Sequence, residues 1–261
     1  MQIGFVGTGN MAGALAAAIE AKHAEHTFIA NDVDAGRLAQ FCADRRRCAR
    51  AGSNREVVEK SIVSFLAVKP QVLDDVLPEL ASSNRLIVSI AAGVTLATLE
   101  DAMPHARVVR VMPNTPCLVG EMAAGYAIGS QVSAEDRVVV DGLLQSAGVA
   151  LELDEPLLDA VTGLSGSGPA FVARLIEAFA AAGADEGLPP ETAHRLALAT
   201  FRGTARLLEE KGLSPDELVQ MVSSPNGTTV AGRAELEQSD YAEVIRRTVG
   251  AAAARSRELG S

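Results

Sequence analysis

The sequence predicts an α/β fold: an N-terminal Rossmann domain with a mostly parallel sheet, followed by an all-α C-terminal dimerisation domain. Up to about residue 160, short continuous apolar runs alternate with helical patterns, as strands buried on both faces of a parallel sheet do. Beyond that point the pattern is helical throughout and rich in alanine. We therefore expect two domains, residues 1–160 and residues 161–261.

The first domain should supply strands and helices in turn. Helices are expected at residues 11–21 and 34–43, with Asp34 as the N-cap of the second. The expected strands are residues 3–6, 27–30, 62–68, 86–90 and 107–112, with residues 125–129 and 149–153 as edge strands.

Helices of the second domain have clear boundary signals. Pro190 opens one helix, while Gly212 closes it and Ser214 with Pro215 opens the next. The expected helices are residues 169–185, 190–211 and 241–259, with shorter ones at 215–221 and 229–237.

Composition and charge indicate which partners and which cellular compartment suit this chain. A net charge of -10 disfavours nucleic acid and membrane surfaces as partners. The one tight basic cluster, Arg45-Arg46-Arg47, is expected on a solvated face. Three cysteines without metal spacing indicate no disulfide framework and a reducing compartment. The chain opens directly on a strand and has no long apolar run, so we expect no signal peptide, no membrane span and a cytoplasmic location.

The strongest motif is Gly7-Thr8-Gly9-Asn10-Met11-Ala12, which follows a strand and opens a helix. This is the context in which a G-x-G-x-x-G/A turn binds a dinucleotide. The first glycine permits the turn, the second lets the backbone approach the pyrophosphate, and the third position must be small for helix–strand packing. The helix N-terminus then offers free N–H groups to the phosphates.

The end of the second expected strand bears on cofactor choice. Asp32 stands where an acidic residue usually binds the ribose 2′-OH of NAD, although it is also consistent with a turn or capping residue. The nearby Arg37 would suit the 2′-phosphate of NADP. The sequence therefore leaves NADH and NADPH both open.

Further candidate segments lie at strand ends and in two loops. Lys69 and Asn114 follow apolar strands, at the sheet edge where ligands of open α/β folds bind. Lys69 alone is equally consistent with a surface lysine, and the segment of Asn114 with a rigid turn. Three glycines in residues 163–168 indicate a close approach of backbone to a partner or ligand. Residues 223–229 carry hydroxyls and no charge before a helix, which suits either a carboxylate cradle or an ordinary capped helix start.

Together these segments resemble the pyrroline-5-carboxylate reductase family, nearly end to end. The similarity rests on the opening turn, Phe65 to Pro70, Ala91 to Thr95, Met112 to Pro116, Ala160 to Ala170 and Val222 to Thr229. It implies NAD(P)H-dependent reduction of 1-pyrroline-5-carboxylate to L-proline, the last step of proline biosynthesis. It also implies a homodimer through the C-terminal helices and a higher homo-oligomer, such as a decamer of dimers.

The resemblance also implies site residues, with NADPH slightly favoured over NADH. Thr229 would meet the ring nitrogen as the catalytic residue. The expected substrate contacts are Glu155, Met221, Ser224, Gly227, Thr228 and Thr229. The expected cofactor contacts are Val6, Gly7, Thr8, Gly9, Asn10, Met11, Asn31, Asp32, Asn54, Ala67, Val68, Lys69, Pro70, Ile90, Ala91 and Ala92. Many members have glycine where this chain has Asn226, a swap that keeps tolerance of left-handed backbone.

Two alternatives remain at this point. A β-hydroxyacid dehydrogenase has a lysine where this chain has Val172, and oxidation of an alcohol needs an acid–base group there. A dinucleotide sensor would need the glycine turn but no substrate cradle. Because a protonated imine is already electrophilic, we expect no metal in the reaction, and His23 and His26 form no metal-binding motif in the sequence.

Overall fold

A computed structural model describes residues 1–260, which fall into two compact units. The first unit is Met1–Ser167 together with the chain from Val249 onward, and the second is Gly168–Thr248. The division therefore follows residue 167 rather than residue 160, and the end of the last helix belongs to the first unit. Ser256 holds it there by donating a hydrogen bond from its hydroxyl to Asp159 Oδ1 at 2.6 Å.

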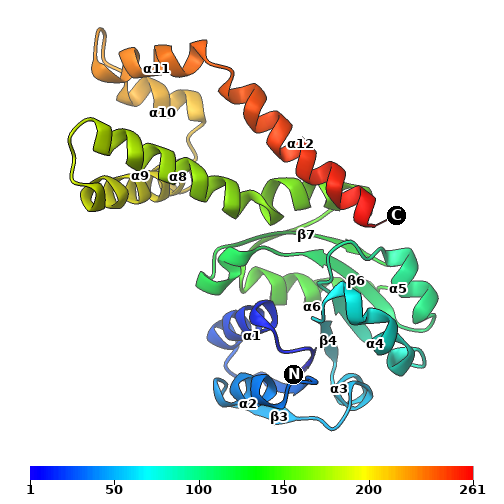
Figure 1. The fold of residues 1–261 in the computed structure, drawn as a ribbon. Coiled ribbons are helices and arrows are strands. Elements are labelled where there is room, and N and C mark those ends of the chain that lie inside the picture. Colours follow the sequence, from blue (N-terminus) through cyan, green and yellow to red (C-terminus); the bar gives the residue numbers. More distant parts are fainter. Residues whose placement is uncertain (261) are drawn as a thin grey trace. The chain divides into compact units, whose positions relative to one another are not determined.

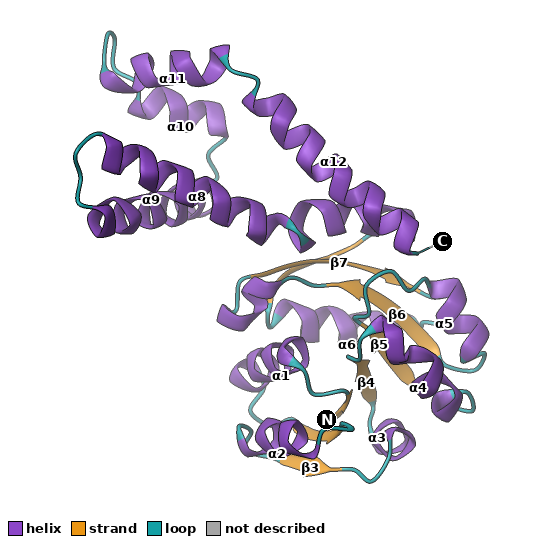
Figure 2. Ribbon diagram, in the orientation of Figure 1, coloured by secondary structure: helices purple, strands orange, loops and turns teal. Residues whose placement is uncertain are grey.

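The first unit is built on one eight-stranded sheet in the order β3-β2-β1-β4-β5-β6-β7-β8 (Figures 1 and 2). All neighbouring strands are parallel except the antiparallel pair β6 and β7. The strands are β1 (Gln2–Val6), β2 (Thr27–Asn31), β3 (Cys48–Arg50), β4 (Val63–Leu66), β5 (Leu86–Ser89), β6 (Arg107–Met112), β7 (Met122–Ile128) and β8 (Gly148–Glu152).

The strand predictions hold with one correction and one omission. β8 is an edge strand as expected, but β7 is not, because it lies between β6 and β8. The other edge is β3, whose three residues contain no apolar run that a sequence pattern would reveal.

Helices cover both faces of the sheet. On one face α1, α2 and α6 pack over Phe5, Phe28 and Phe65, and on the other face α3, α4 and α5 pack over Leu66 and Ile87. The helices of this unit are α1 (Asn10–Lys22), α2 (Ala35–Ala43), α3 (Asn54–Lys60), α4 (Leu73–Leu80), α5 (Leu96–Ala102), α6 (Ala134–Gln145) and α7 (Leu158–Val161). A π-helical segment, Thr162–Gly166, follows α7.

The second unit is helical, as predicted. It contains α8 (Gly168–Asp185), α9 (Pro190–Lys211), α10 (Pro215–Val222), α11 (Thr228–Gln238) and the start of α12 (Tyr241–Leu259). Of its residues, all of which the structure describes, only Ala193 and Ala197 are buried. A unit that buries so little apolar surface within one chain needs a further surface to cover its helices.

Glycine-rich residues 163–168 show the close backbone approach expected of them, and it occurs within the chain. A Cβ on Gly163 would lie 2.6 Å from the carbonyl oxygen of Val249 in α12. Asn114 fixes the same segment, because its Nδ2 donates to the Ser165 carbonyl at 3.0 Å and its Oδ1 accepts from Ala123 N at 2.9 Å. The Asn114 amide thus anchors the segment after β6.

Two expectations about α2 and its surroundings are wrong. Cys42 and Cys48 form a disulfide with a Cα–Cα distance of 5.0 Å, whereas Cys117 is free and buried. Arg45, expected on a solvated face, is only 8% exposed. Its guanidinium lies 3.6 Å from the centroid of the Phe41 ring and donates to the carbonyls of Phe41 and Gly13. Neither cysteine pairing nor arginine burial has a signature at this spacing in a single sequence.

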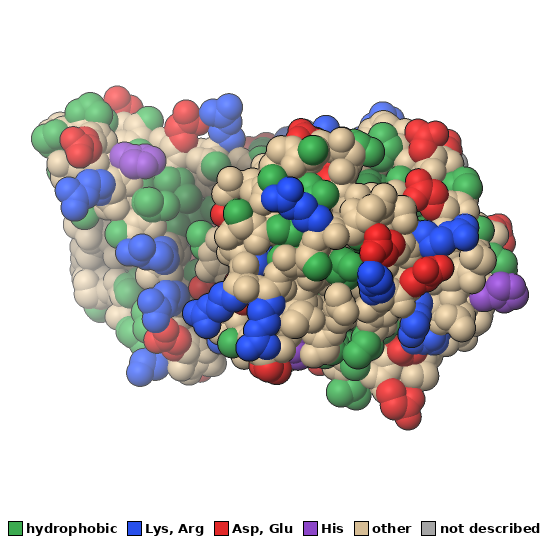
Figure 3. Space-filling view, turned by 90° about the horizontal axis from the view of Figure 1, so that it is seen from below, with side chains coloured by type: hydrophobic (Ala, Val, Ile, Leu, Met, Phe, Trp, Pro, Cys, Tyr) green, Lys and Arg blue, Asp and Glu red, His purple; other side chains and the backbone are tan. Residues whose placement is uncertain are grey.

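Within residues 1–260, no helix combines the length and apolar character that crossing a membrane requires. On the face seen in Figure 3, acidic and basic side chains are interspersed.

Candidate functional site

A cleft of about 580 Å³ opens in the first unit, at the carboxyl ends of β1, β4, β5 and β6. The position is a topological switch point, because the chain from β1 continues to β2 on one side while β4 pairs with β1 on the other. The residues that line it are Gly9, Asn10, Met11, Arg37, Ala67, Val68, Lys69, Pro70, Ile90, Ala91, Ala92, Met112 and Pro113.

The three small residues of the glycine turn after β1 differ in their surroundings in the way that the sequence motif predicts. Gly7 has φ +89°, and a Cβ there would lie 2.8 Å from the Ala67 carbonyl oxygen, so the turn requires glycine. At Gly9 no heavy atom of the described residues lies within 4 Å of an added Cβ. Ala12 is buried in the core. The backbone at Gly9 is therefore open for a ligand to approach.

The N-terminus of α1 faces this opening with its backbone donors available. Gly9 is the N-cap residue, and no side chain among the described residues caps the helix. The first intrahelical bond runs from Gly13 N to the Gly9 carbonyl at 2.9 Å. The N–H groups of the first turn and the positive end of the helix dipole can thus hold a pyrophosphate.

A second hollow of about 360 Å³ adjoins the cleft between α1 and α2. It shares Gly9, Asn10 and Arg37 with the cleft and adds Thr8 and Arg45. Arg37 is tied to Asp34, whose Oδ2 lies 3.2 Å from Arg37 Nη2. A cationic side chain at this point would suit a phosphate group of a dinucleotide, such as the 2′-phosphate of NADP.

Asp32 is fixed by hydrogen bonds from the glycine turn after β1 and from the backbone that follows β2. Its Oδ2 accepts from Thr8 N at 2.7 Å and Thr8 Oγ1 at 2.9 Å, and its Oδ1 accepts from Asp34 N at 2.8 Å. Burial alone would raise the pKa of Asp32, but these donors outweigh it and lower that pKa. A carboxylate offers about four acceptor positions. Asp32 therefore acts first as a brace of the turn and keeps acceptor capacity for a ribose hydroxyl.

Other predicted cofactor residues lie behind the cleft rather than on its surface. Val6 is buried in the sheet, and Gly7 N donates to the Asn31 carbonyl at 2.9 Å. Asn31 and Asn54 are brought together, with Asn31 Nδ2 donating to Asn54 Oδ1 at 2.8 Å. Lys69, by contrast, is exposed in the cleft.

The predicted substrate loop lies wholly in the second unit, between α10 and α11. Gly227 N donates to the Ser224 carbonyl at 2.9 Å, which closes a tight turn. A Cβ on Gly227 would lie 2.4 Å from Ser224 Oγ and 3.0 Å from the Ser224 carbonyl oxygen, so a side chain there would displace the Ser224 hydroxyl. Asn226 has φ +58°, the one positive φ outside glycine among the described residues, which confirms the expected left-handed backbone.

Donors at the start of α11 remain available for an anion. Gly227 is its N-cap residue, and no side chain within residues 1–260 caps the helix. Thr228 and Thr229 form its first turn. Next to the loop, Ser223 Oγ is buried and has no hydrogen-bond partner among the described residues. Ser223 belongs to the candidate loop of residues 223–229 but not to the expected substrate contacts, since only burial distinguishes it from any other serine.

Of the two further substrate candidates, Met221 lies exposed on α10, near the loop, whereas Glu155 is engaged in the first unit. Glu155 Oε1 accepts from Arg110 Nη1 at 2.8 Å and from Leu96 N at 2.6 Å. It thereby caps the start of α5 and neutralises a buried arginine. These contacts favour a structural role for Glu155 over a contact with substrate.

Two family models match the chain. One is described as pyrroline-5-carboxylate reductase dimerisation and matches residues 155–259. The other is described as NADP oxidoreductase coenzyme F420-dependent and matches residues 2–93.

Several proteins of known name are similar to this chain over nearly its full length. The chain is 40% identical to a pyrroline-5-carboxylate reductase of Synechocystis, in an alignment that covers 100% of this chain and 98% of the relative. A solved pyrroline-5-carboxylate reductase from Coxiella burnetii has a TM-score of 0.94 at 30% identity and covers 99% of this chain and 98% of its own. The Plasmodium falciparum pyrroline carboxylate reductase, solved with NADP bound, has a TM-score of 0.85 at 29% identity and covers 100% and 98%.

Proposed function

This chain belongs to the pyrroline-5-carboxylate reductase family, and from that premise we propose which of its residues carry the reaction. The enzyme uses NAD(P)H to reduce 1-pyrroline-5-carboxylate to L-proline, the last step of proline biosynthesis. One hydride and one proton are added across a carbon–nitrogen double bond. The protein must therefore hold a dinucleotide, hold a small cyclic carboxylate, and favour positive charge on the ring nitrogen.

The cleft of the first unit is the proposed dinucleotide site. Two observations support the fit: the space over Gly9 is open, and the N-terminus of α1 has no side-chain cap. When bound, the reduced nicotinamide supplies the hydride. The N–H groups of Asn10 and Met11 would hold the pyrophosphate, and the strand-end residues Ala67 to Pro70 and Ile90 to Ala92 would form the walls.

Cofactor preference follows from the residues around Asp32. Its carboxylate would accept a ribose hydroxyl, whereas Arg37 would attract a 2′-phosphate. We propose that Arg37 outweighs Asp32 and gives a modest preference for NADPH, because the donors that surround Asp32 already offset much of its charge.

The loop from Ser224 to Thr229 is the proposed substrate cradle. N–H groups at the start of α11, with the hydroxyls of Ser224 and Thr228, would bind the carboxylate. Thr229 Oγ1 would accept the N–H of the protonated imine, which stabilises the electrophilic form of the ring. Met221, on the preceding helix, would contact the apolar part of the ring. The buried, unpaired hydroxyl of Ser223 supports a polar ligand beside this loop.

Positioning supplies the remaining rate enhancement. A protonated imine needs no Lewis acid to accept a hydride, so the side chains have only to orient the ring and keep it charged. Correct orientation of two bound reactants is worth up to roughly 7–11 kcal/mol of barrier.

Assembly follows from the second unit, whose helices expose most of their apolar residues. The dimerisation model that matches residues 155–259 indicates a homo-oligomer. We propose that the basic assembly is a dimer through these helices and that dimers associate further, up to a decamer of dimers. We also propose a cytoplasmic location without nucleic-acid or membrane partners, which the net charge of -10 supports and the Cys42–Cys48 disulfide does not.

The direct test is turnover of 1-pyrroline-5-carboxylate with NADPH and NADH in parallel. We expect both cofactors to be oxidised, with one proline formed per cofactor and a higher kcat/KM for NADPH. Arg37→Ala should lower kcat/KM with NADPH and leave the value with NADH nearly unchanged. Tight cofactor binding without turnover would contradict the proposed function, and equal losses with both cofactors would contradict the role of Arg37.

A further inference from the structure

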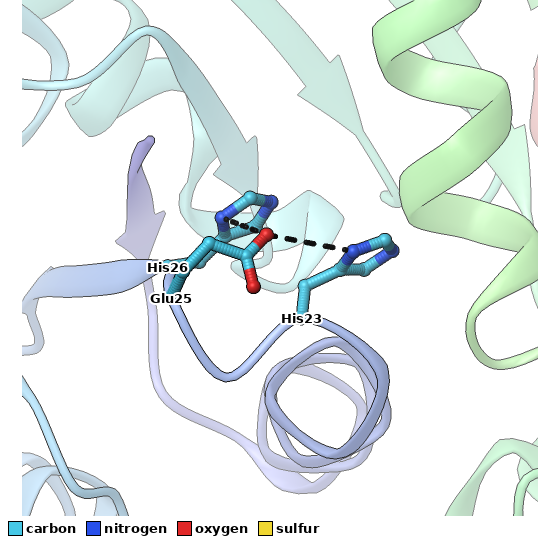
Figure 4. Close-up of side chains that lie close together, drawn as sticks. All are labelled: His23, Glu25 and His26. Atoms are coloured by element: carbon cyan, nitrogen blue, oxygen red, sulfur yellow. Dashed lines mark ion pairs between the residues drawn. The ribbon is translucent and has the colours of Figure 1, made fainter.

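The turn that joins α1 to β2 brings together two histidines and a carboxylate that have no proposed part in the reductase chemistry (Figure 4). His26 Nδ1 lies 3.2 Å and His23 Nδ1 lies 3.7 Å from the same oxygen, Glu25 Oε1. One ligand atom from each of the three residues falls within 4.8 Å of the others. In Figure 4 both rings point toward the carboxylate, which lies between them.

The backbone explains why the three side chains converge. α1 ends at Lys22, and His23 is its C-cap residue. His26 N donates to the His23 carbonyl at 3.0 Å, which makes residues 23–26 a tight turn. The turn sets the two imidazole rings side by side, with centroids 5.1 Å apart and planes only 10° from parallel. A convergent donor set is thus built into the link between a helix and a strand.

The spacing of the donor atoms suits a tetrahedral metal ion. Zn–N and Zn–O bonds of about 2.0–2.1 Å place neighbouring ligand atoms roughly 3.3 Å apart. The two observed N–O distances, 3.2 Å and 3.7 Å, lie close to that spacing, and all three ligand atoms lie within 4.8 Å of one another, so side-chain rotation would have to bring the two histidines closer to one ion. Two imidazoles and a carboxylate are a donor set that zinc, nickel and copper accept.

His26 is only 7% exposed, whereas His23 is half-buried and Glu25 is exposed, so the site opens to solvent on one side. The amino nitrogen of Met1 lies 3.1 Å from His26 Nδ1 and would have to turn aside before that nitrogen could bind an ion.

We propose that His23, Glu25 and His26 bind one divalent transition-metal ion, zinc foremost, with solvent completing the coordination. The site ties the end of α1 to the start of β2 through side chains of three residues. It lies at the amino end of β2, whereas the cofactor cleft lies at the carboxyl ends of the strands. The bound ion would stabilise the first unit and leave hydride transfer unchanged, and the sequence-based expectation of no metal would then apply to the reaction alone.

The test uses the full-length, untagged protein after treatment with a chelator. Titration with ZnCl₂, followed by calorimetry and by the melting temperature, should show one saturable site per chain and a rise in Tm of several degrees. MgCl₂ at the same concentration should produce no rise, because imidazole ligands disfavour Mg²⁺.

Variants assign the site to its residues. His23→Ala and Glu25→Gln alter exposed or half-buried side chains, so both should fold, and each should weaken zinc binding by at least about tenfold. His105→Ala, which alters an exposed histidine outside the turn, should bind zinc as the wild type does. The proposal is overturned if the wild type shows no saturable zinc site, or if His23→Ala and Glu25→Gln bind zinc as tightly as the wild type.

Discussion

At the scale of single residues, Gly7 and Gly9 serve different ends within one turn. Gly7 is required by the fold, because its φ of +89° and the adjacent Ala67 carbonyl exclude a side chain. The fold does not require glycine at Gly9, since a Cβ there meets no protein atom among the described residues within 4 Å. We propose that the bound dinucleotide is what requires it. The two positions look alike in the sequence motif and are separated only by their surroundings.

Alanine at each position should therefore give opposite results. Gly9→Ala should keep the wild-type melting temperature and raise the KM for NADPH by roughly tenfold or more, about 1.4 kcal/mol. Gly7→Ala should lower the melting temperature, because a left-handed backbone costs a side chain about 1–2 kcal/mol before any clash. Thermal melts and cofactor titrations of both variants check the pair. A destabilised Gly9→Ala with normal cofactor binding would contradict this division.

Glu155, a predicted substrate contact, shows how a carboxylate can instead stabilise the fold. Arg110 is buried, and Glu155 is its ion-pair partner at 2.8 Å. Glu155→Gln should cost about 1–3 kcal/mol of folding stability, since the arginine loses a charged acceptor. The KM for 1-pyrroline-5-carboxylate should stay within about twofold, a change worth only about 0.4 kcal/mol. A large rise in that KM without a fall in melting temperature would restore Glu155 to the substrate site.

At the scale of elements, the sequence predicts most strands, α1, α2 and the helices of the second unit, whereas it misses α3 to α7 of the first unit. Apolar runs identify β4, β5 and β6 because strands buried on both faces cannot tolerate polar residues. Pro190 and Gly212 fix the two ends of α9, and Ser214 caps α10 through Glu217 as its position suggests. Local signals suffice wherever a residue type has a fixed geometric consequence.

What the sequence misses depends on contacts between distant residues or on very short elements. The prediction of β7 as an edge strand is wrong because pairing order is set by topology and not by local pattern. Glu155 and Arg110 are 45 residues apart, and Asp32 is fixed by Thr8, 24 residues earlier. The candidate site was predictable at the turn, since its glycine motif is local, whereas its bracing contacts were not.

The disulfide between Cys42 and Cys48 links the end of α2 to β3 and encloses the loop that carries Arg45. A bridge that closes so short a loop should stabilise the fold by about 2 kcal/mol in the chain-entropy account. Reduction, or Cys42→Ser, should therefore lower the melting temperature by several degrees. Cys117→Ser serves as the control for loss of a thiol, although its burial calls for a check of folding.

Thiol counting in denaturant tests the pairing itself. After incubation with oxidised glutathione and removal of the reagent, the denatured protein should expose one free thiol, that of Cys117. Addition of a reductant before denaturation should expose all three cysteines of the chain. Three free thiols in the oxidised sample would contradict the disulfide.

At the scale of the whole molecule, the two units differ in how they are stabilised. The first unit has a core on each face of its sheet, whereas the second buries only Ala193 and Ala197. On α8, Val172, Leu175 and Phe179 follow helical spacing along one face and are exposed. Such a stripe is stable in water only when another surface covers it, which is the role that dimerisation assigns to a second copy.

A charge on this stripe should break the assembly. Leu175→Glu should shift the molar mass measured by light scattering toward that of one chain and abolish most turnover. Arg174→Gln, at the neighbouring exposed position, removes only a surface ion pair and should keep the assembly intact, since such pairs contribute about 0–1 kcal/mol. A fully assembled Leu175→Glu protein would exclude this stripe from the interface.

Substitution of Thr229 tests most directly whether the substrate cradle and the dinucleotide cleft are separate sites. Thr229→Ala should lower kcat/KM for 1-pyrroline-5-carboxylate by roughly tenfold to a hundredfold, because the ring nitrogen loses its acceptor, while the Kd for NADPH stays at the wild-type value. Thr229→Ser, which keeps the hydroxyl, should recover most of the activity. Loss of NADPH binding in Thr229→Ala, or full activity with wild-type kinetics, would contradict the assignment of dinucleotide and substrate to separate segments of the chain.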